Sequence, residues 1–135
     1  MNYKIEDIEG IGKARAEKLA QAGIKTTGHL LAQAASARGR KVVAEKCGVS
    51  SVRLLKWVNM ADLMRISGVG EEYSELLEAA NCNTVKQLRR RNPQNLTKRM
   101  LEINAEKKLV RSPPSEAQVK KWVEQAAKLE PMLTY

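Results

Sequence analysis

The sequence predicts an all-α protein made of two similar helical halves, and three observations support this fold class. The first is the core palette: apolar residues make up 43% of the 135 residues and Phe is absent, so the core must come mainly from Leu, Ile, Val, Met and Ala. The second is the abundance of Glu, Lys, Gln and Arg, which together with Ala favour helices over sheets. The third is an internal repeat that covers nearly the whole chain.

The repeat begins in two glycine hairpins. A shift of 58 residues aligns Ile8–Leu31 with Ile66–Arg89, and eight of these 24 positions are identical, including both glycines of each hairpin. Gly23 is aligned with Asn81, and both residue types tolerate the left-handed conformation that often follows a helix. The repeat therefore predicts the same helix end in both copies.

A later part of the repeat sets the two halves. A shift of 65 residues aligns Leu54–Met64 with Val119–Leu129, and each segment contains the letters KWV. The second copy therefore has about seven extra residues, which we place in KKLVRSPPSE because its two prolines exclude a helix interior. The predicted halves are residues 1–65 and 66–135, packed as one unit with approximate two-fold symmetry.

Within each half the apolar spacing is helical throughout. In the first half, one helix follows the hairpin, a second follows the Thr26 cap, a third in RKVVAEKCG stops at Gly48, and a fourth starts from Ser50 or Ser51. The second half supplies four more segments: EEYSELLEAA, VKQLRRR, NLTKRMLEINAEKKL and SEAQVKKWVEQAAKL. The total is about eight helices, and no segment has the pattern of a strand.

The charge balance limits the partners. The net charge is +9 and the isoelectric point is near 9.8. Such a balance attracts polyanions, nucleic acid above all, although solubility alone is the other explanation. No window approaches a membrane span, and the N-terminus lacks the apolar run of a signal peptide, so we expect no membrane partner and a cytoplasmic protein.

The residues that usually carry chemistry are sparse. Cys47 and Cys82 have no CxxC spacing, and we expect both to be small buried hydrophobic residues in a reducing cytoplasm. His29 is the only histidine and is expected to be structural. A nucleophile–histidine site is therefore unsupported. We expect no catalytic residue, no metal site and no enzyme activity.

The hairpin in GIGKAR is a candidate anion site. Glycines permit positive φ and leave the backbone bare, and we expect both Gly12 and Gly70 to need that freedom. The helix that follows presents unpaired N–H groups and a dipole that favours negative charge. Other phosphate motifs are excluded, because Arg15 stands where a dinucleotide fingerprint needs its third glycine and no GxxxxGK[ST] occurs.

The pattern apolar–x–Gly–apolar–Gly before an amphipathic helix resembles the helix-hairpin-helix motif of DNA ligases, Holliday-junction proteins, excision-nuclease subunits and family X polymerases. The resemblance implies that backbone amides of the hairpin grip a DNA phosphate without reading bases, sometimes with a monovalent cation under the turn. No other cofactor is expected. The whole chain is also similar to a bacterial family of duplicated domains of unknown function. The residues to which the motif points are Gly10, Ile11, Gly12 and Lys13, and by repeat Gly68, Val69 and Gly70.

The two hairpins differ in charge. Lys13 and Arg15 follow the first hairpin, where helix stability alone would favour acids. Glu71 and Glu72 follow the second and would repel a phosphate. Each hairpin can also be no more than a tight connection between helices. We interpret the second hairpin mainly in that way and the first as a phosphate site.

Other basic clusters can add backbone contacts. The first contains Arg38, Arg40 and Lys41. A second, in which phosphate contact and a solvated face remain equal alternatives, contains Lys86, Arg89, Arg90, Arg91, Lys98 and Arg99. The two Trp residues, both in KWV segments, are interpreted as core or inter-half contacts and not as stacking platforms.

The favoured function is sequence-independent DNA binding by a non-enzymatic module. The main alternative is a protein-interaction or assembly module on the same helical scaffold, with the acidic second hairpin helix as a docking face. A third hypothesis is a nuclease or repair accessory whose active site lies on another chain. A salt titration of DNA binding distinguishes the DNA-binding hypothesis from the protein-interaction hypothesis most directly.

Overall fold

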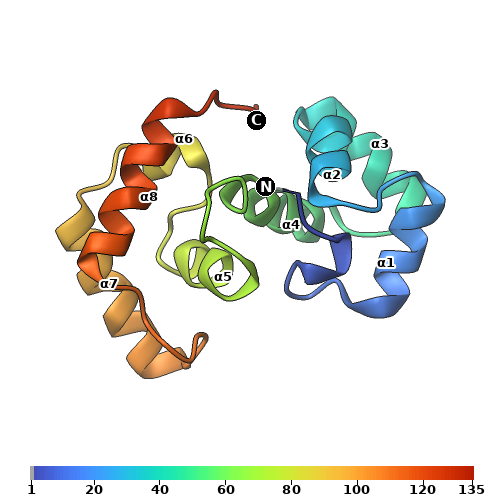
Figure 1. The fold of residues 1–135 in the computed structure, drawn as a ribbon. Coiled ribbons are helices and arrows are strands. Elements are labelled where there is room, and N and C mark those ends of the chain that lie inside the picture. The colour runs from blue at the N-terminus through green and yellow to red at the C-terminus, as the bar shows by residue number, and fades with distance from the viewer. Residues whose placement is uncertain (1) are drawn as a thin grey trace.

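A computed structural model describes residues 2–135 and shows eight α-helices and no β-strand in that range (Figure 1). The first half contains a 3-10 turn η1 (Ile5–Asp7) and the helices α1 (Gly12–Gln21), α2 (Thr27–Ala34), α3 (Ala37–Cys47) and α4 (Ser51–Leu63). The second half contains α5 (Glu71–Ala79), α6 (Val85–Leu88), α7 (Pro93–Lys107) and α8 (Glu116–Lys128). The predicted all-α class with eight helices is confirmed.

Six of these helices begin at a side-chain cap. In each, the oxygen of a Ser, Thr or Asn side chain accepts the backbone N–H three residues later, which satisfies one of the unpaired donors of the first turn. The capping residues are Thr26, Ser36, Ser50, Thr84, Asn92 and Ser115. The two helices without a side-chain cap, α1 and α5, are those that follow the glycine hairpins.

The predicted helix ends are also present. Gly23 and Asn81 both have positive φ, 82° and 63°, just after α1 and α5. Gly48 ends α3 in the left-handed conformation, and its N–H donates to the carbonyl of Ala44. Lys108 ends α7 in the same way without being a glycine.

Two apolar clusters form the core, and α4 contributes to both. The first cluster is built from buried residues of the first half, and the second is built from those of the second half together with Leu63 of α4. Leu63 and Met64 are neighbours in the chain, but each is fully buried in a different cluster. α4 packs against α2 on one side and α5 on the other and lies in the middle of the molecule in Figure 1.

Each tryptophan is buried within its own half and packs under the hairpin of that half. A Cβ placed on Gly10 would lie 3.6 Å from Nε1 of Trp57, and a Cβ on Gly68 would lie 3.4 Å from Nε1 of Trp122. This contact explains why the hairpin and the KWV segment are repeated together. The prediction that both Trp residues belong to the core is confirmed.

The last residues return to the first half. We call residues 130–135 the C-terminal strap. The Thr134 N–H donates to the carbonyl of Ala35 at 2.9 Å, and the Tyr135 hydroxyl bonds Oδ1 of Asn59 at 3.2 Å. Leu133 packs against the first apolar cluster. The strap therefore ties the two halves together at the side of the molecule where α2 ends.

Arg40 anchors this strap from inside the protein. Its guanidinium donates to the carbonyls of Ala34 and Ala35 at 3.1 and 2.8 Å and to the carbonyl of Thr134 at 2.6 Å. It also lies 5.5 Å from the ring centroid of Tyr135, a cation–π arrangement. Arg40 is 7% exposed, so it is removed from the candidate phosphate contacts. Arg40 lies on the same face of α3 as the buried residues Val43, Ala44 and Cys47. Their three- and four-residue spacing is that of the buried face of a helix.

The conformations of Gly12 and Gly70 differ, which corrects the expectation that both need glycine. Gly12 has φ of 67°, whereas Gly70 has φ of −106°, which other residues adopt. We expect Gly12→Ala to lower the free energy of unfolding by about 1 kcal/mol, the usual cost of a left-handed non-glycine residue. Gly70→Ala should change it little. Urea unfolding of both variants tests this, and an equal loss would contradict it.

Removal of the strap anchor is expected to destabilise the fold. Arg40→Met should lower the free energy of unfolding by about 2 kcal/mol, because buried carbonyls lose a charged donor. Lys41→Met is the matched control, since Lys41 is exposed on the next position of the same helix. Chemical denaturation measures both. An unchanged midpoint for Arg40→Met would show that the strap contributes nothing to stability.

Candidate nucleic-acid interface

The two glycine hairpins have the same turn geometry. We call residues 8–12 hairpin 1 and residues 66–70 hairpin 2. The Ile11 N–H donates to the carbonyl of Ile8 at 3.3 Å, and the Val69 N–H donates to that of Ile66 at 3.1 Å. The third residue of each turn is a glycine with φ of 92° or 91°, as a type II turn requires.

The apolar residue between the glycines anchors each hairpin. The side chains of Ile11 and Val69 are buried in the cores of their halves. The backbone N–H of each is already used inside its turn. Ile11 was predicted to contact phosphate, but the structure gives it an anchoring position. The groups of hairpin 1 that face solvent belong to Glu9, Gly10 and Gly12.

Hairpin 2 is closed by a side chain from α8. The Ser67 N–H donates to Oε1 of Gln125 at 2.5 Å. The repeat places Met60 at the position that corresponds to Gln125, and a thioether is only a weak acceptor. Gln125 therefore satisfies a turn amide of hairpin 2 in a way that hairpin 1 does not reproduce.

The helix that follows hairpin 1 has the electrostatics of an anion site. α1 begins at Gly12 with no side-chain cap and no acid in its first turn. Lys13 is exposed. Nη1 of Arg15 donates to the carbonyl of Gly10 at 3.2 Å, which holds the guanidinium over the hairpin. Unpaired N–H groups, the helix dipole and two cationic side chains therefore coincide here.

Carboxylates gather where the two hairpins approach each other. Figure 1 shows hairpin 1 and the start of α5 on the same side of α4. A hydrogen bond with Glu9, partial burial, and the nearby charges of Glu9, Asp7 and Glu75 raise the pKa of Glu71 to about 7. The pKa of Glu75 is raised as well, by burial first and by Glu9 next. Glu71 is therefore only partly ionised at neutral pH, which lowers the negative charge beside hairpin 1.

The other basic residues predicted for the first half lie away from hairpin 1. Arg38 and Lys41 are exposed near the start of α3. Figure 1 shows the start of α3 and the start of α1 on opposite sides of the first half. The structure therefore does not join these residues and hairpin 1 into one cluster.

The basic residues of the second half surround the turn from α6 to α7. Lys86, Arg90 and Lys98 are exposed. Nη1 of Arg91 donates to the carbonyl of Asn81 at 3.4 Å, and Nη1 of Arg99 lies 3.5 Å from Oε2 of Glu102. Arg89, the last of this group, is half-buried.

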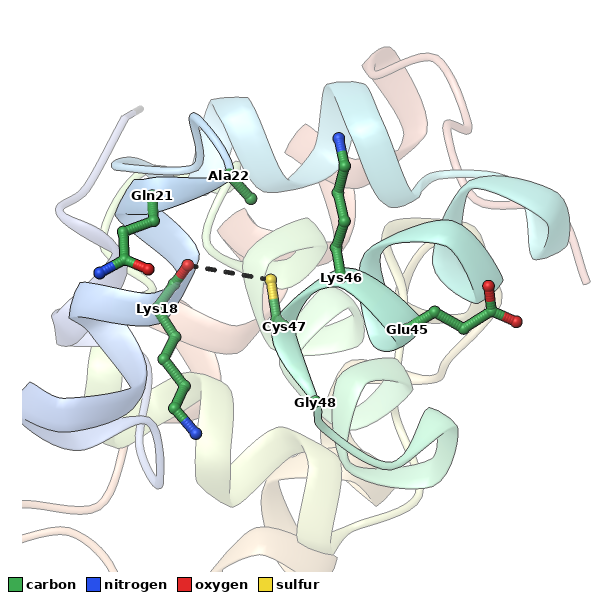
Figure 2. A pocket seen from close by; sticks show the side chains of 7 residues that line it. All are labelled: Lys18, Gln21, Ala22, Glu45, Lys46, Cys47 and Gly48. Carbon is green, nitrogen blue, oxygen red and sulfur yellow. Dashed lines mark hydrogen bonds between the residues drawn. The ribbon is translucent and has the colours of Figure 1, made fainter.

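One feature that the sequence pattern did not indicate is an open pocket of about 570 Å³ between the ends of α1 and α3 (Figure 2). The Cys47 thiol is directed at the carbonyl of Lys18, with a sulfur–oxygen distance of 4.0 Å. Burial raises the pKa of this thiol and raises that of Cys82 to about 12, so neither is an activated nucleophile. Both cysteines are buried and unbridged, as predicted.

The remaining candidates for chemistry are structural. Nδ1 of His29 accepts the N–H of Lys25 at 3.2 Å, and the His29 N–H donates to the Thr26 cap. Within residues 2–135, no group of three or more Asp, Glu, His or Cys side chains is placed to hold a metal ion. No helix in the same residues combines the length and apolarity needed to cross a membrane.

The chain belongs to the family described as Domain of unknown function (DUF4332), which matches residues 9–129. The matched range contains all eight α-helices and most of hairpin 1, and it ends just before the C-terminal strap. No curated protein and no solved structure matches the chain. The family description names no function, so the function must be argued from the surface.

The raised pKa of Glu71 makes stability depend on pH. The pKa of Glu71 is about 7 in the folded chain against an ordinary 4.5, so the folded state binds this proton more tightly. Its effect on stability is most favourable below an ordinary glutamate pKa and declines as the pH rises toward 7. The raised pKa means that the hydrogen bond with Glu9, burial and the nearby carboxylates together outweigh the favourable contact of a carboxylate with the start of α5.

We therefore expect Glu71→Gln to melt at a higher temperature than the natural chain at about pH 8 and at nearly the same temperature at about pH 5. Glu72→Gln is the control, because Glu72 pairs with exposed Arg111 at 3.4 Å and should gain nothing at the higher pH. Thermal unfolding followed by circular dichroism measures both. An equal difference in melting temperature between Glu71→Gln and the natural chain at both pH values would contradict the raised pKa of Glu71.

Proposed function

We propose that this member of the family is a non-enzymatic module that binds the phosphate backbone of DNA without sequence preference, with hairpin 1 as the principal contact. The observation that carries the proposal is the difference between the hairpins. α1 follows a glycine turn, has no side-chain cap and no acid in its first helical turn, and Arg15 lies over the glycine turn. Hairpin 2 is closed by Gln125 and followed by Glu71 and Glu72.

The contact would use backbone donors and two side chains. Gly10, Gly12 and Lys13 are exposed, and their backbone N–H groups would donate to the anion, as at other helix starts that follow a glycine turn. Lys13 and Arg15 add two positive charges. The resemblance to the helix-hairpin-helix motif supports the same assignment, including a monovalent cation under the turn. None of these groups reads a base edge, so little sequence preference is expected.

The expected affinity is modest. If about four to six phosphates are contacted, log K should fall with log salt at a slope of about −4 to −5. The net charge of +9 favours encounter with a polyanion from a distance. Micromolar or weaker binding at physiological salt follows from so few contacts.

A second candidate function is protein assembly through the acidic start of α5. This helix has four glutamates and no basic residue. The pKa values of two of them are raised, at Glu71 first by a hydrogen bond with Glu9 and at Glu75 first by burial, and repulsion from nearby carboxylates adds to both shifts. A basic protein surface would relieve this repulsion. Absence of DNA binding at low salt would favour this candidate.

Charge reversal next to each hairpin tests the proposed function. Lys13→Glu with Arg15→Glu should weaken DNA binding several-fold and make the salt slope shallower by about one unit for each phosphate that is no longer bound. Glu71→Lys with Glu72→Lys is the matched reversal on α5 and should leave binding unchanged or strengthen it. Fluorescence anisotropy with duplex DNA over a salt series gives both values, and melting temperatures show that the variants are folded. Equal losses of affinity would contradict specialisation of hairpin 1.

A further inference from the structure

A second basic surface covers the turn between α6 and α7. It consists of six cationic side chains within 14 consecutive residues that contain no acid. We call this the α6–α7 surface, and its members are Lys86, Arg89, Arg90, Arg91, Lys98 and Arg99. Such a segment is usually no more than a solvated, charged face. The contacts of its side chains therefore decide whether a binding role has to be considered.

Contacts within the protein leave most of this charge uncompensated. Lys86, Arg90 and Lys98 are exposed and form no ion pair in the part of the chain that the structure describes. Arg99 pairs with Glu102, but both side chains are more than half exposed, and such a pair contributes little. Mutual repulsion of these cations therefore opposes folding without a compensating contact, and a bound polyanion would relieve it.

The α6–α7 surface is far from hairpin 1. In Figure 1 the α6–α7 turn and α1 lie at opposite ends of the molecule, with α5 between them. α5 carries four glutamates and no basic residue. A straight duplex that touched both basic regions would have to pass this acidic helix, in which Glu72 and Glu78 have cationic partners and Glu71 and Glu75 have none among the ion pairs of the described residues. Bending a short duplex around them is costly, because DNA is stiff over about 150 base pairs.

We propose that the α6–α7 surface is a second contact for the phosphate backbone of duplex DNA, and that one molecule bridges two DNA segments, one at hairpin 1 and one at this surface. The inference rests on the proposed function, since it assumes that hairpin 1 binds DNA. It adds that the acidic α5 separates the two contacts, so that they engage different duplexes.

The experiment separates binding from bridging. A duplex of about 30 base pairs, well below the stiffness length of DNA, is fixed to beads, and a fluorescent copy is added with the full chain at low salt. Fluorescence captured on the beads measures bridging, and anisotropy of the free duplex measures binding. The variant carries Lys86→Glu, Arg90→Glu and Lys98→Glu, with a milder form in which the same residues become Gln. The control carries Lys18→Glu, Lys46→Glu and Arg53→Glu, which makes the same change of charge at exposed positions of the first half.

The natural chain and the control should bridge. The variant should lose capture by about tenfold or more while its affinity for one duplex falls by only about threefold to tenfold, because hairpin 1 remains. Lys13→Glu with Arg15→Glu should also abolish capture. Binding without capture by the natural chain, or capture by the folded α6–α7 variants, would overturn this inference and leave the proposed function intact. A natural chain that binds no DNA would overturn both.

Discussion

Asp62 carries a carboxylate into the junction of the two halves with only 1% of its surface exposed, so its charge must be matched by donors close at hand. Arg65 supplies one at 2.8 Å, and the Val85 N–H at the start of α6 supplies another at 2.8 Å. Arg65 also donates to the carbonyl of Glu130 at 2.7 Å, where the strap begins. A single buried charge thus orders α4, α6 and the strap together, and removing any partner would leave a buried carboxylate only partly satisfied.

The position of the hairpins follows from this arrangement. α4 is shared by both apolar clusters and bears Trp57 under hairpin 1, while α5 packs on α4 and follows hairpin 2. The two hairpins consequently lie close enough for Glu9 to raise the pKa of Glu71. The same duplicated turn packs helices against a tryptophan in both halves, and the anion contact that we propose uses only the first copy.

Local chemistry was readable from the sequence, whereas contacts between distant residues were not. The caps at Thr26 and Thr84, the helix end at Gly48 and the burial of both Trp residues depend on residue type and on short spacing, so the pattern predicted them. The phosphate role given to Arg40 failed because its partner Thr134 lies 94 residues later in the chain. The helical register of Arg40 with Val43 and Cys47 was the available signal. The nearness of Glu9 to Glu71 and the closure of hairpin 2 by Gln125 left no comparable mark in the sequence.

The distance along the chain between Arg40 and its strap also matters while the protein is being made. The guanidinium of Arg40 and the carbonyl of Ala35 leave the ribosome long before Thr134 does. At common translation rates the intervening 94 residues take about 5–20 s, far longer than a small helical unit needs to fold. During that interval the first half holds a cation at its surface that the finished protein buries. The contact between Arg40 and the strap therefore forms only after the second half has been synthesised.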